Sequence, residues 1–240
     1  MGSERVLIGT AGWGIGADVR ERFGDGATRL QRYATRFSCV EINSSFYRPH
    51  RPATYARWAA SVPDGFRFAL KLPKEITHAR RLVDATQPLD AFLAESAALG
   101  EKRGVVLVQL PPSLAFDAAV ADAFFARVRE RYAGGLACEP RHASWFDARA
   151  DAMLAGFAVA RVAADPAVVP ETSAPGGWRG FAYHRLHGSP RMYYSAYDAG
   201  TLASVAERLR ATTVPAWCIF DNTAFGVATG NALELAELLA

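Results

Sequence analysis

Short apolar runs recur along the chain, and stretches with helical periodicity separate them. The runs predict buried strands at residues 5–10, 38–43, 66–72, 104–110, 135–140, 157–162, 181–187 and 215–221. Apolar residues spaced three or four apart predict helices at 52–60, 88–99, 117–132, 145–155, 201–209 and 231–239, with Asp117 as an N-cap. Strands that alternate with helices are typical of a parallel sheet covered by helices.

The number and order of these elements predict a single α/β domain over residues 1–240, folded as a (β/α)8 barrel of the TIM type. An open, doubly wound sheet is the alternative, because it is built from the same strand and helix units. In either case polar residues at the C-terminal ends of the strands are expected to form the functional site. Residues 165–180, rich in proline and glycine, predict one long loop after the sixth strand.

Composition and charge narrow the class of protein only moderately. Half of the residues (50%) are hydrophobic and the net charge is +3, which by itself indicates neither nucleic acid nor membrane as a partner. Cys39, Cys138 and Cys218 lie inside predicted strands and are expected to be buried, reduced thiols. No apolar run approaches the ~20 residues of a membrane span, and the N-terminus lacks a signal-peptide pattern. We therefore expect a cytoplasmic protein without a membrane segment.

Charged side chains stand where several predicted strands end. Successive residues of a strand face opposite sides, so these side chains should point away from the apolar face that packs on the helices. In a barrel they would converge on one mouth, and they are Glu41, Lys71, Glu139, Arg185 and His187. The alternative is a structural layer of buried ion pairs, which barrel interiors also contain.

The loops after these strands add further candidate binding residues. They are Asn43, Tyr47, Arg48, His78, Gln109, Arg141, Trp145, Asp221 and Asn222. Trp145 has an equally good alternative, which is to pack at the start of a helix. Together with the five charged residues, they make up the predicted site.

Several ordered motifs resemble the YecE-like family, catalogued as domain of unknown function 72. The similar segments are 9–13, 40–48, 68–71 with 77–78, 109–113, 139–141 with 145, 185–188, and 221–223 with 231–232. The resemblance covers almost the whole chain and implies a TIM-type barrel with the family residues around its mouth. It implies no reaction. Two segments depart from the family pattern: residues 14–17 replace an aromatic-rich stretch, and Asp221-Asn222 stands where relatives resemble a pair of asparagines.

An enzyme is the first functional hypothesis. Glu139 would be the general base or a metal ligand, Glu41 its acid/base partner, and His187 a proton shuttle. Lys71 and Arg185 would form an electrostatic clamp. Because cations outnumber acids around the mouth, we expect acid/base or hydrolytic chemistry on an anionic substrate, most simply a phosphate ester or phosphodiester. A divalent metal is an alternative that no HxxxH or HxH spacing supports, so no cofactor is assigned.

A non-catalytic nucleic-acid-binding protein is the second hypothesis. Aromatic side chains can stack on bases while arginines contact phosphates. The residues of this type expected near the mouth are Trp13, Phe46, Tyr47, Arg48, Arg141, Trp145, Arg191, Tyr193 and Tyr194. The segment 192–194 can instead pack beneath the long loop. The sequence leaves the oligomeric state open.

Overall fold

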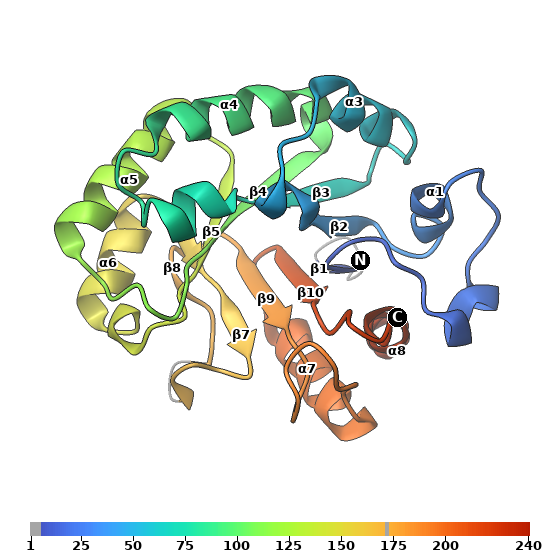
Figure 1. Ribbon diagram of the computed structural model, residues 1–240. Helices are drawn as coiled ribbons and strands as arrows, with labels where there is room; N and C mark the ends of the chain where they lie inside the picture. The colour runs from blue at the N-terminus through green and yellow to red at the C-terminus, as the bar shows by residue number, and fades with distance from the viewer. Residues whose placement is uncertain (1–5, 171–172) are drawn as a thin grey trace.

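Two sheets form the centre of the protein in a computed structural model that describes residues 6–170 and 173–240 (Figure 1). One is four-stranded with the order β1–β10–β9–β7, and the other is six-stranded with the order β2–β3–β4–β5–β6–β8. Neighbouring strands are parallel, except that β8 pairs antiparallel with β6. The strands are β1 Val6–Thr10, β2 Cys39–Ile42, β3 Arg67–Lys71, β4 Arg103–Gln109, β5 Gly135–Glu139, β6 Val159–Arg161, β7 Ala163–Asp165, β8 Gly176–Gly177, β9 Ala182–Leu186 and β10 Ala216–Phe220. Each of the eight predicted strands overlaps an observed one, and only β4 begins outside its predicted range, by one residue.

The two sheets meet where β1 lies beside β2, and the chain passes from one sheet to the other between β6, which neighbours the edge strand β8, and β7. Just after β1, the N–H of Gly12 donates to the carbonyl of Glu41 at 2.8 Å, and Ala11 pairs with Glu41 in a parallel bridge. Gly9 allows β1 to approach β2 here, because a Cβ atom at this position would lie 2.4 Å from the Cys39 carbonyl oxygen. Only Val162 separates β6 from β7 along the chain, and these strands belong to different sheets.

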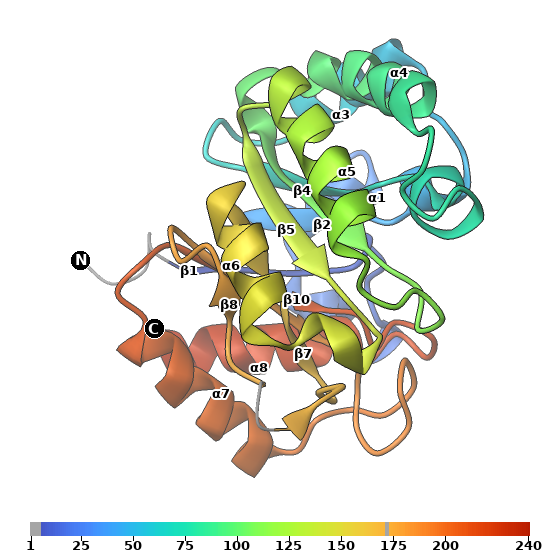
Figure 2. The same cartoon turned by 90° about the vertical axis from the view of Figure 1, so that its left-hand side faces the viewer.

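Helices lie around the outside of the strands, as Figure 1 and Figure 2 show. They are α1 Arg29–Tyr33, α2 Ser44–Tyr47, α3 Pro52–Ala60, α4 Thr86–Ser96, α5 Ala118–Arg131, α6 Ala148–Gly156, α7 Ala199–Ala211 and α8 Ala228–Leu239. The six predicted helices are confirmed with shifted ends, and the Asp117 side chain accepts from two N–H groups of α5 as its N-cap. Helices α1 and α2 were missed because five or four residues are too few to show a periodicity.

The long loop predicted over residues 165–180 lies between β7 and β9. The described part of this connection, residues 166–170 and 173–181, contains β8 and no helix. Pro166, Pro170, Pro175, Gly176 and Gly177 interrupt the segment, and these residue types are unfavourable inside a helix. Across the described residues, no helix is both long and apolar enough to span a membrane.

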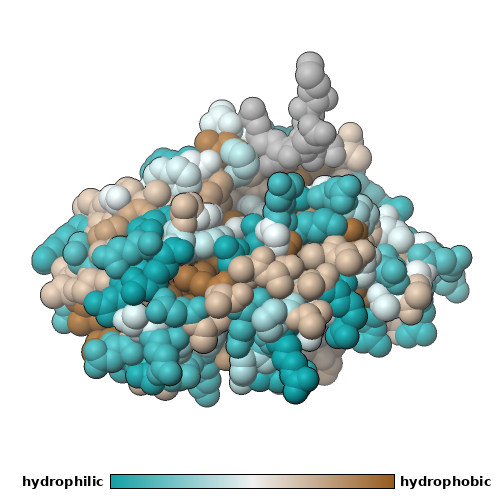
Figure 3. All heavy atoms as spheres, turned by 90° about the horizontal axis from the view of Figure 1, so that it is seen from above, coloured by the Kyte–Doolittle hydropathy of each residue, from teal (hydrophilic) through white to brown (hydrophobic). Residues whose placement is uncertain are grey.

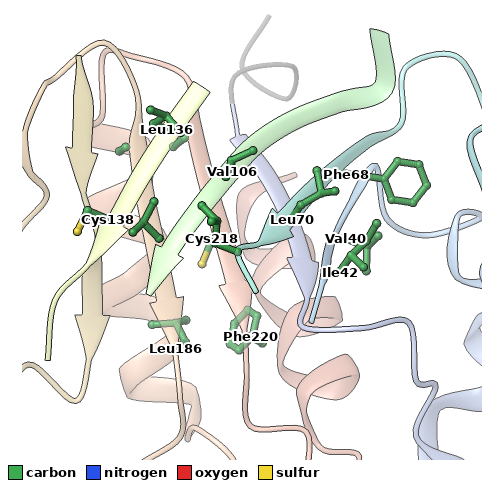
Figure 4. Close-up of a cluster of buried hydrophobic side chains, with 14 of the residues drawn as sticks. Val40, Ile42, Phe68, Leu70, Val106, Leu136, Cys138, Leu186, Cys218 and Phe220 are labelled. Carbon is green, nitrogen blue, oxygen red and sulfur yellow. The ribbon is translucent and has the colours of Figure 1, made fainter. Parts of the chain in front are cut away.

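Alternation along the strands divides the core into two hydrophobic clusters. The larger cluster lies between strands and helices and includes Val40, Ile42, Phe68, Leu70, Leu136 and Cys138 (Figure 4). The smaller cluster contains Cys39, Ala69, Ala137 and Tyr183, which occupy the opposite face. This confirms the predicted faces of the second, third, fifth and seventh strands. Because side chains alternate, the residue two positions after each member of the smaller cluster continues its face.

Candidate functional site

Arg185 on β9 lies at the centre of a cluster of buried charges. Its side chain is fully buried (0% exposed), and it is hydrogen-bonded to three carboxylates. Nε and Nη2 donate to the two oxygens of Glu41 at 3.1 and 2.7 Å, and Nη1 donates to Oε2 of Glu139 at 2.6 Å. Nη2 also donates to Oδ2 of Asp221 at 3.0 Å. One guanidinium thus joins carboxylates from β2, β5 and the end of β10, and Glu41, Glu139, Arg185, His187 and Asp221 are called the Arg185 cluster below.

His187 joins two of these carboxylates on the side away from Glu41. Its Nδ1 lies 3.1 Å from Oδ2 of Asp221, and its Nε2 lies 2.8 Å from Oε1 of Glu139. Nη2 of Arg141 also lies 3.3 Å from His187 Nε2. The imidazole is thereby held in one orientation between two acids.

Arg141 closes the cluster on the solvent side. Its Nε and Nη2 donate to Oε1 of Glu139 at 3.2 and 3.0 Å, and its Nη1 donates to the hydroxyl of Tyr193 at 2.6 Å. The Arg141 side chain is 16% exposed, so unlike Arg185 it can reach a ligand. The bond to Tyr193 attaches the loop after β9 to the loop after β5.

The cluster keeps the carboxylates of Glu139 and Asp221 ionised. Burial alone would raise the pKa of Glu139, but the positive charges of Arg185, Arg141 and His187 hold it well below its usual value. The pKa of Asp221 is lowered for the same reason, since Arg185 and His187 outweigh the effect of burial. Carboxylates held this way are weak proton acceptors at neutral pH.

Lys71, the last residue of β3, borders this cluster but is not paired within it. Its side chain is 8% exposed, and its Nζ lies 4.1 Å from the centre of the Phe46 ring. Among the described residues, no carboxylate lies within 4.0 Å of this nitrogen. Burial, followed by the positive charge of Arg185, lowers the pKa of Lys71 to about 8, although the acids of the cluster partly oppose the shift. Lys71 therefore loses its proton closer to neutral pH than an ordinary lysine does.

His78 lies beside Lys71 in a region of positive charge. Its Nδ1 is 2.8 Å from the hydroxyl of Thr77, and its ring packs edge-on against Phe46. Burial lowers the pKa of His78, and the charges of Lys71, Lys74 and Arg141 lower it further. Three cations therefore act on one neutral imidazole.

The amide side chains have supporting positions. Asn43 donates to Oδ1 of Asp221 at 3.4 Å, and its own Oδ1 is buried with no hydrogen-bond partner among the described residues. Gln109 donates to the neighbouring main-chain carbonyl at 3.2 Å. Asn222 donates to the Ser195 carbonyl and to Asn231, each at 3.0 Å, so it holds the loop after β9 against the start of α8.

Three predicted site residues do not join the cluster. Tyr47 is 78% exposed on the short helix α2, and the next residue, Arg48, is also exposed. Both residues line a separate surface hollow, which Pro73 and Pro88 also line. Trp145 is 1% exposed, and its indole N–H donates to the Leu114 carbonyl at 2.9 Å. Trp145 thus has the packing role that was its alternative interpretation.

Sequence reasoning did not assign Tyr183 to the site, and it expected Phe46 near the mouth only as a base-stacking residue. Tyr183 donates to Oε2 of Glu41 at 2.8 Å, and Phe46 covers the amine of Lys71. Tyr183 was detectable, because it lies two residues before Arg185 on the same face of its strand. The position of Phe46 depends on the turn of α2, for which the sequence carried no signal.

The carboxylate oxygens of the Arg185 cluster are directed at Arg185. Within residues 6–170 and 173–240, no group of three or more His, Cys, Asp or Glu side chains is arranged to hold a metal ion. Oxygen atoms of all three carboxylates accept from Arg185.

Comparisons with known proteins were consistent with one another. The family model described as "Protein of unknown function DUF72" matches residues 7–240. The UPF0759 protein YecE of Escherichia coli K12 is 35% identical over 106 residues, which are 44% of this chain and 38% of that protein. The UPF0759 protein YunF of Bacillus subtilis 168 is 28% identical over 149 residues, which are 59% of this chain and 52% of that protein. The matched segments thus span about half or less of these relatives.

Solved structures of low sequence identity share the fold. A DUF72 family protein of Enterococcus faecalis V583 has a TM-score of 0.82 at 19% identity, covering 98% of this chain and 95% of that one. A DUF72 family protein of Thermotoga maritima MSB8 has a TM-score of 0.78 at 24% identity, covering 98% of both chains. A β-mannanase of Mytilus edulis has a TM-score of 0.52 at 10% identity, covering 98% of this chain and 91% of that one.

Proposed function

The chain belongs to the DUF72 family, whose description names no function, and we propose that it is an enzyme that performs acid/base chemistry on a small anionic substrate, most simply a phosphate ester. The observation that carries this proposal is the group of cations on the solvent side of the Arg185 cluster. Lys71, Lys74 and Arg141 all act on the neutral ring of His78. Lys71 makes no ion pair within the described residues, so its charge remains available to a ligand.

We also infer that the two sheets are the halves of a (β/α)8 barrel in which β6 and β7 together form one bent strand. The contacts between β1 and β2 and the direct succession of β6 and β7 support this inference. So does the arrangement of the helices around the strands in Figure 1. Barrel enzymes carry their sites at the C-terminal ends of the strands, where Lys71, Glu139, Arg185 and Asp221 are found.

The geometry supports roles that differ from those first assigned. Arg185 is fully buried and hydrogen-bonded to three carboxylates, so it positions these acids and does not clamp the substrate. Glu139 orients His187 and Arg141, because its lowered pKa makes it a weak base. Lys71 is the proton-transfer group, and Arg141 contacts the anion. Phosphate suits these two residues, since an ammonium and a guanidinium both donate several hydrogen bonds.

Thermal shift measurements test this proposal. We expect glycerol 3-phosphate to raise the melting temperature and glycerol, which lacks the phosphate, to leave it unchanged. The Lys71→Met and Arg141→Met variants should lose most of this shift. Arg80→Met, which removes an exposed guanidinium paired with Glu75, should keep it. Equal effects of glycerol and its phosphate, or a full shift in Arg141→Met, would contradict the proposal.

Non-catalytic nucleic-acid binding is the second candidate, and one surface feature favours it. The guanidinium of Arg191 lies 3.9 Å from the centre of the Tyr194 ring, which packs against Phe225 at 5.0 Å. Phe225 is 71% exposed, so an unpaired base could stack on it. The face of the molecule shown in Figure 3 is mostly hydrophilic or intermediate, with hydrophobic residues in small separate areas. Affinity for oligonucleotides that falls steeply with salt, without turnover, would favour this candidate.

A further inference from the structure

Lysine is rare in this chain. Of its 27 basic residues of the Lys and Arg types, only Lys71, Lys74 and Lys102 are lysines. Lys102 donates to the carbonyls of Ala59 and Val62 at 2.8 and 2.7 Å, so its amine serves the structure. Lys74 is exposed. Lys71 is the one lysine whose amine is buried at the border of the charge cluster.

The surroundings of Lys71 differ from those of an ion-pairing lysine. The charged groups that act on it are Arg185, Glu41, Glu139 and Asp221. Each of the three acids is hydrogen-bonded to Arg185, and Asp221 and Glu139 also lie against His187. None of them lies within 4.0 Å of the Lys71 nitrogen in the described part of the chain. Phe46 covers the amine on one side, which excludes water there.

From this arrangement we propose that Lys71 is a nucleophile that forms an imine with the aldehyde or ketone group of a phosphate- or carboxylate-bearing substrate. The inference rests on the proposed anion-binding function and adds the carbonyl group to the description of the substrate. A buried lysine amine beside another cation is the usual setting for such chemistry. An arginine at this position could bind the anion equally well but could not form the imine.

The reaction is balanced without a further reactant. The lone pair of the neutral Nζ attacks the carbonyl carbon, and a C–N bond forms while the carbonyl oxygen takes up a proton. The nitrogen then loses its protons as the hydroxyl group leaves as water, and the C–O bond is replaced by a C=N bond. One amine and one carbonyl give one imine and one water, with no oxidation or reduction.

The amine must be neutral to attack. Burial and the charge of Arg185 bring the pKa of Lys71 to about 8. At pH 7.5 such an amine is neutral in about a quarter of the molecules, compared with roughly a thousandth for an ordinary exposed lysine. Lys71 should therefore react much faster than Lys74, which is exposed and serves as an internal reference in the same molecule.

Reductive trapping tests the inference. The full-length protein is incubated with dihydroxyacetone phosphate and cyanoborohydride, and labelled lysines are located by peptide mass spectrometry. We expect Lys71 to be labelled at least about tenfold faster than Lys74, with a half-maximal rate near pH 8. Glycerol 3-phosphate, which has no carbonyl group, should give no adduct but should slow the labelling of Lys71.

Two variants of Lys71 serve as controls, so that the test does not depend on one variant that fails to fold. Lys71→Arg keeps the positive charge and Lys71→Met keeps the length of the side chain, and neither should be labelled at this position. Melting temperatures establish that at least one of them is folded. Labelling confined to Lys74 and Lys102 in the unmodified protein would overturn the inference.

The outcomes separate this inference from the function on which it rests. If glycerol 3-phosphate stabilises the protein but Lys71 is labelled no faster than Lys74, the imine is refuted and the anion site stands. If Lys71 is labelled rapidly by acetaldehyde while no phosphate ester binds, the nucleophile is supported and the anionic substrate is refuted. If neither effect is seen, both proposals are wrong.

Discussion

Replacing Arg185 with methionine removes the guanidinium that three buried carboxylates share. The methionine side chain is of similar length and fills most of the space, so the main effect is the loss of charge and hydrogen bonds. Glu41 and Glu139 are buried as completely as Arg185, and Asp221 nearly so. None of them can turn to water without displacing the surrounding strands.

The structure indicates a large cost for this substitution. Removing one partner of a buried ion pair typically costs about 3–5 kcal/mol, because it leaves an uncompensated charge. Arg185 has three such partners, so we expect a loss at the upper end, about 5 kcal/mol. In a domain of this size, 1 kcal/mol corresponds to about 2–4 °C, so the melting temperature should fall by roughly 10–20 °C.

The loss of stability caused by Arg185→Met should become smaller as the pH falls. In the unmodified protein the pKa values of Glu139 and Asp221 are lowered, so these acids stabilise the fold above their ordinary pKa values. That contribution disappears as the pH falls through the lowered values. Without Arg185, burial raises the pKa of these carboxyls, and protonation then relieves the buried charge. The stability difference between the two proteins should therefore narrow between pH 7 and pH 5.

Urea unfolding followed by circular dichroism at pH 7 and pH 5 measures both effects. Arg80→Met is the matched control, because it removes a partly exposed guanidinium that is paired with Glu75. Exposed ion pairs contribute at most about 1 kcal/mol, so the control should remain close to the unmodified protein. An Arg185→Met variant as stable as Arg80→Met at pH 7 would refute the description of the cluster as a buried charge network.

Three further predictions follow from individual residues. Asp221→Asn should destabilise the protein most at neutral pH, and melting curves should show the difference shrinking once the pH falls below the ordinary pKa of an aspartate towards the lowered pKa of Asp221. Trp145→Phe should cost about 1–3 kcal/mol through lost packing and a lost hydrogen bond, without changing the thermal shift caused by glycerol 3-phosphate. Burial raises the pKa of the thiols of Cys39, Cys138 and Cys218. Ellman's reagent should therefore react with these cysteines only after the protein is unfolded.

The sequence by itself determined the order of the elements and the face on which each strand residue lies. The period of two along a strand is a local property, so the amino-acid order alone places Glu139 and Arg185 on the face opposite the helices. The N-cap at Asp117 and the buried cysteines were predictable for the same reason, since neighbouring residues in the chain decide them.

Only the tertiary structure decided how the charged groups pair. Arg185 is separated from Glu41 by 144 positions and from Glu139 by 46, and no local pattern records which acid reaches which nitrogen. The guanidinium of Arg185, expected to clamp a substrate, is hydrogen-bonded to three carboxylates in the structure. This pairing also left Lys71 without an acid partner among the described residues. Burial and the charges within a few ångströms set the pKa of a side chain, and folding brings those charges together from distant parts of the chain.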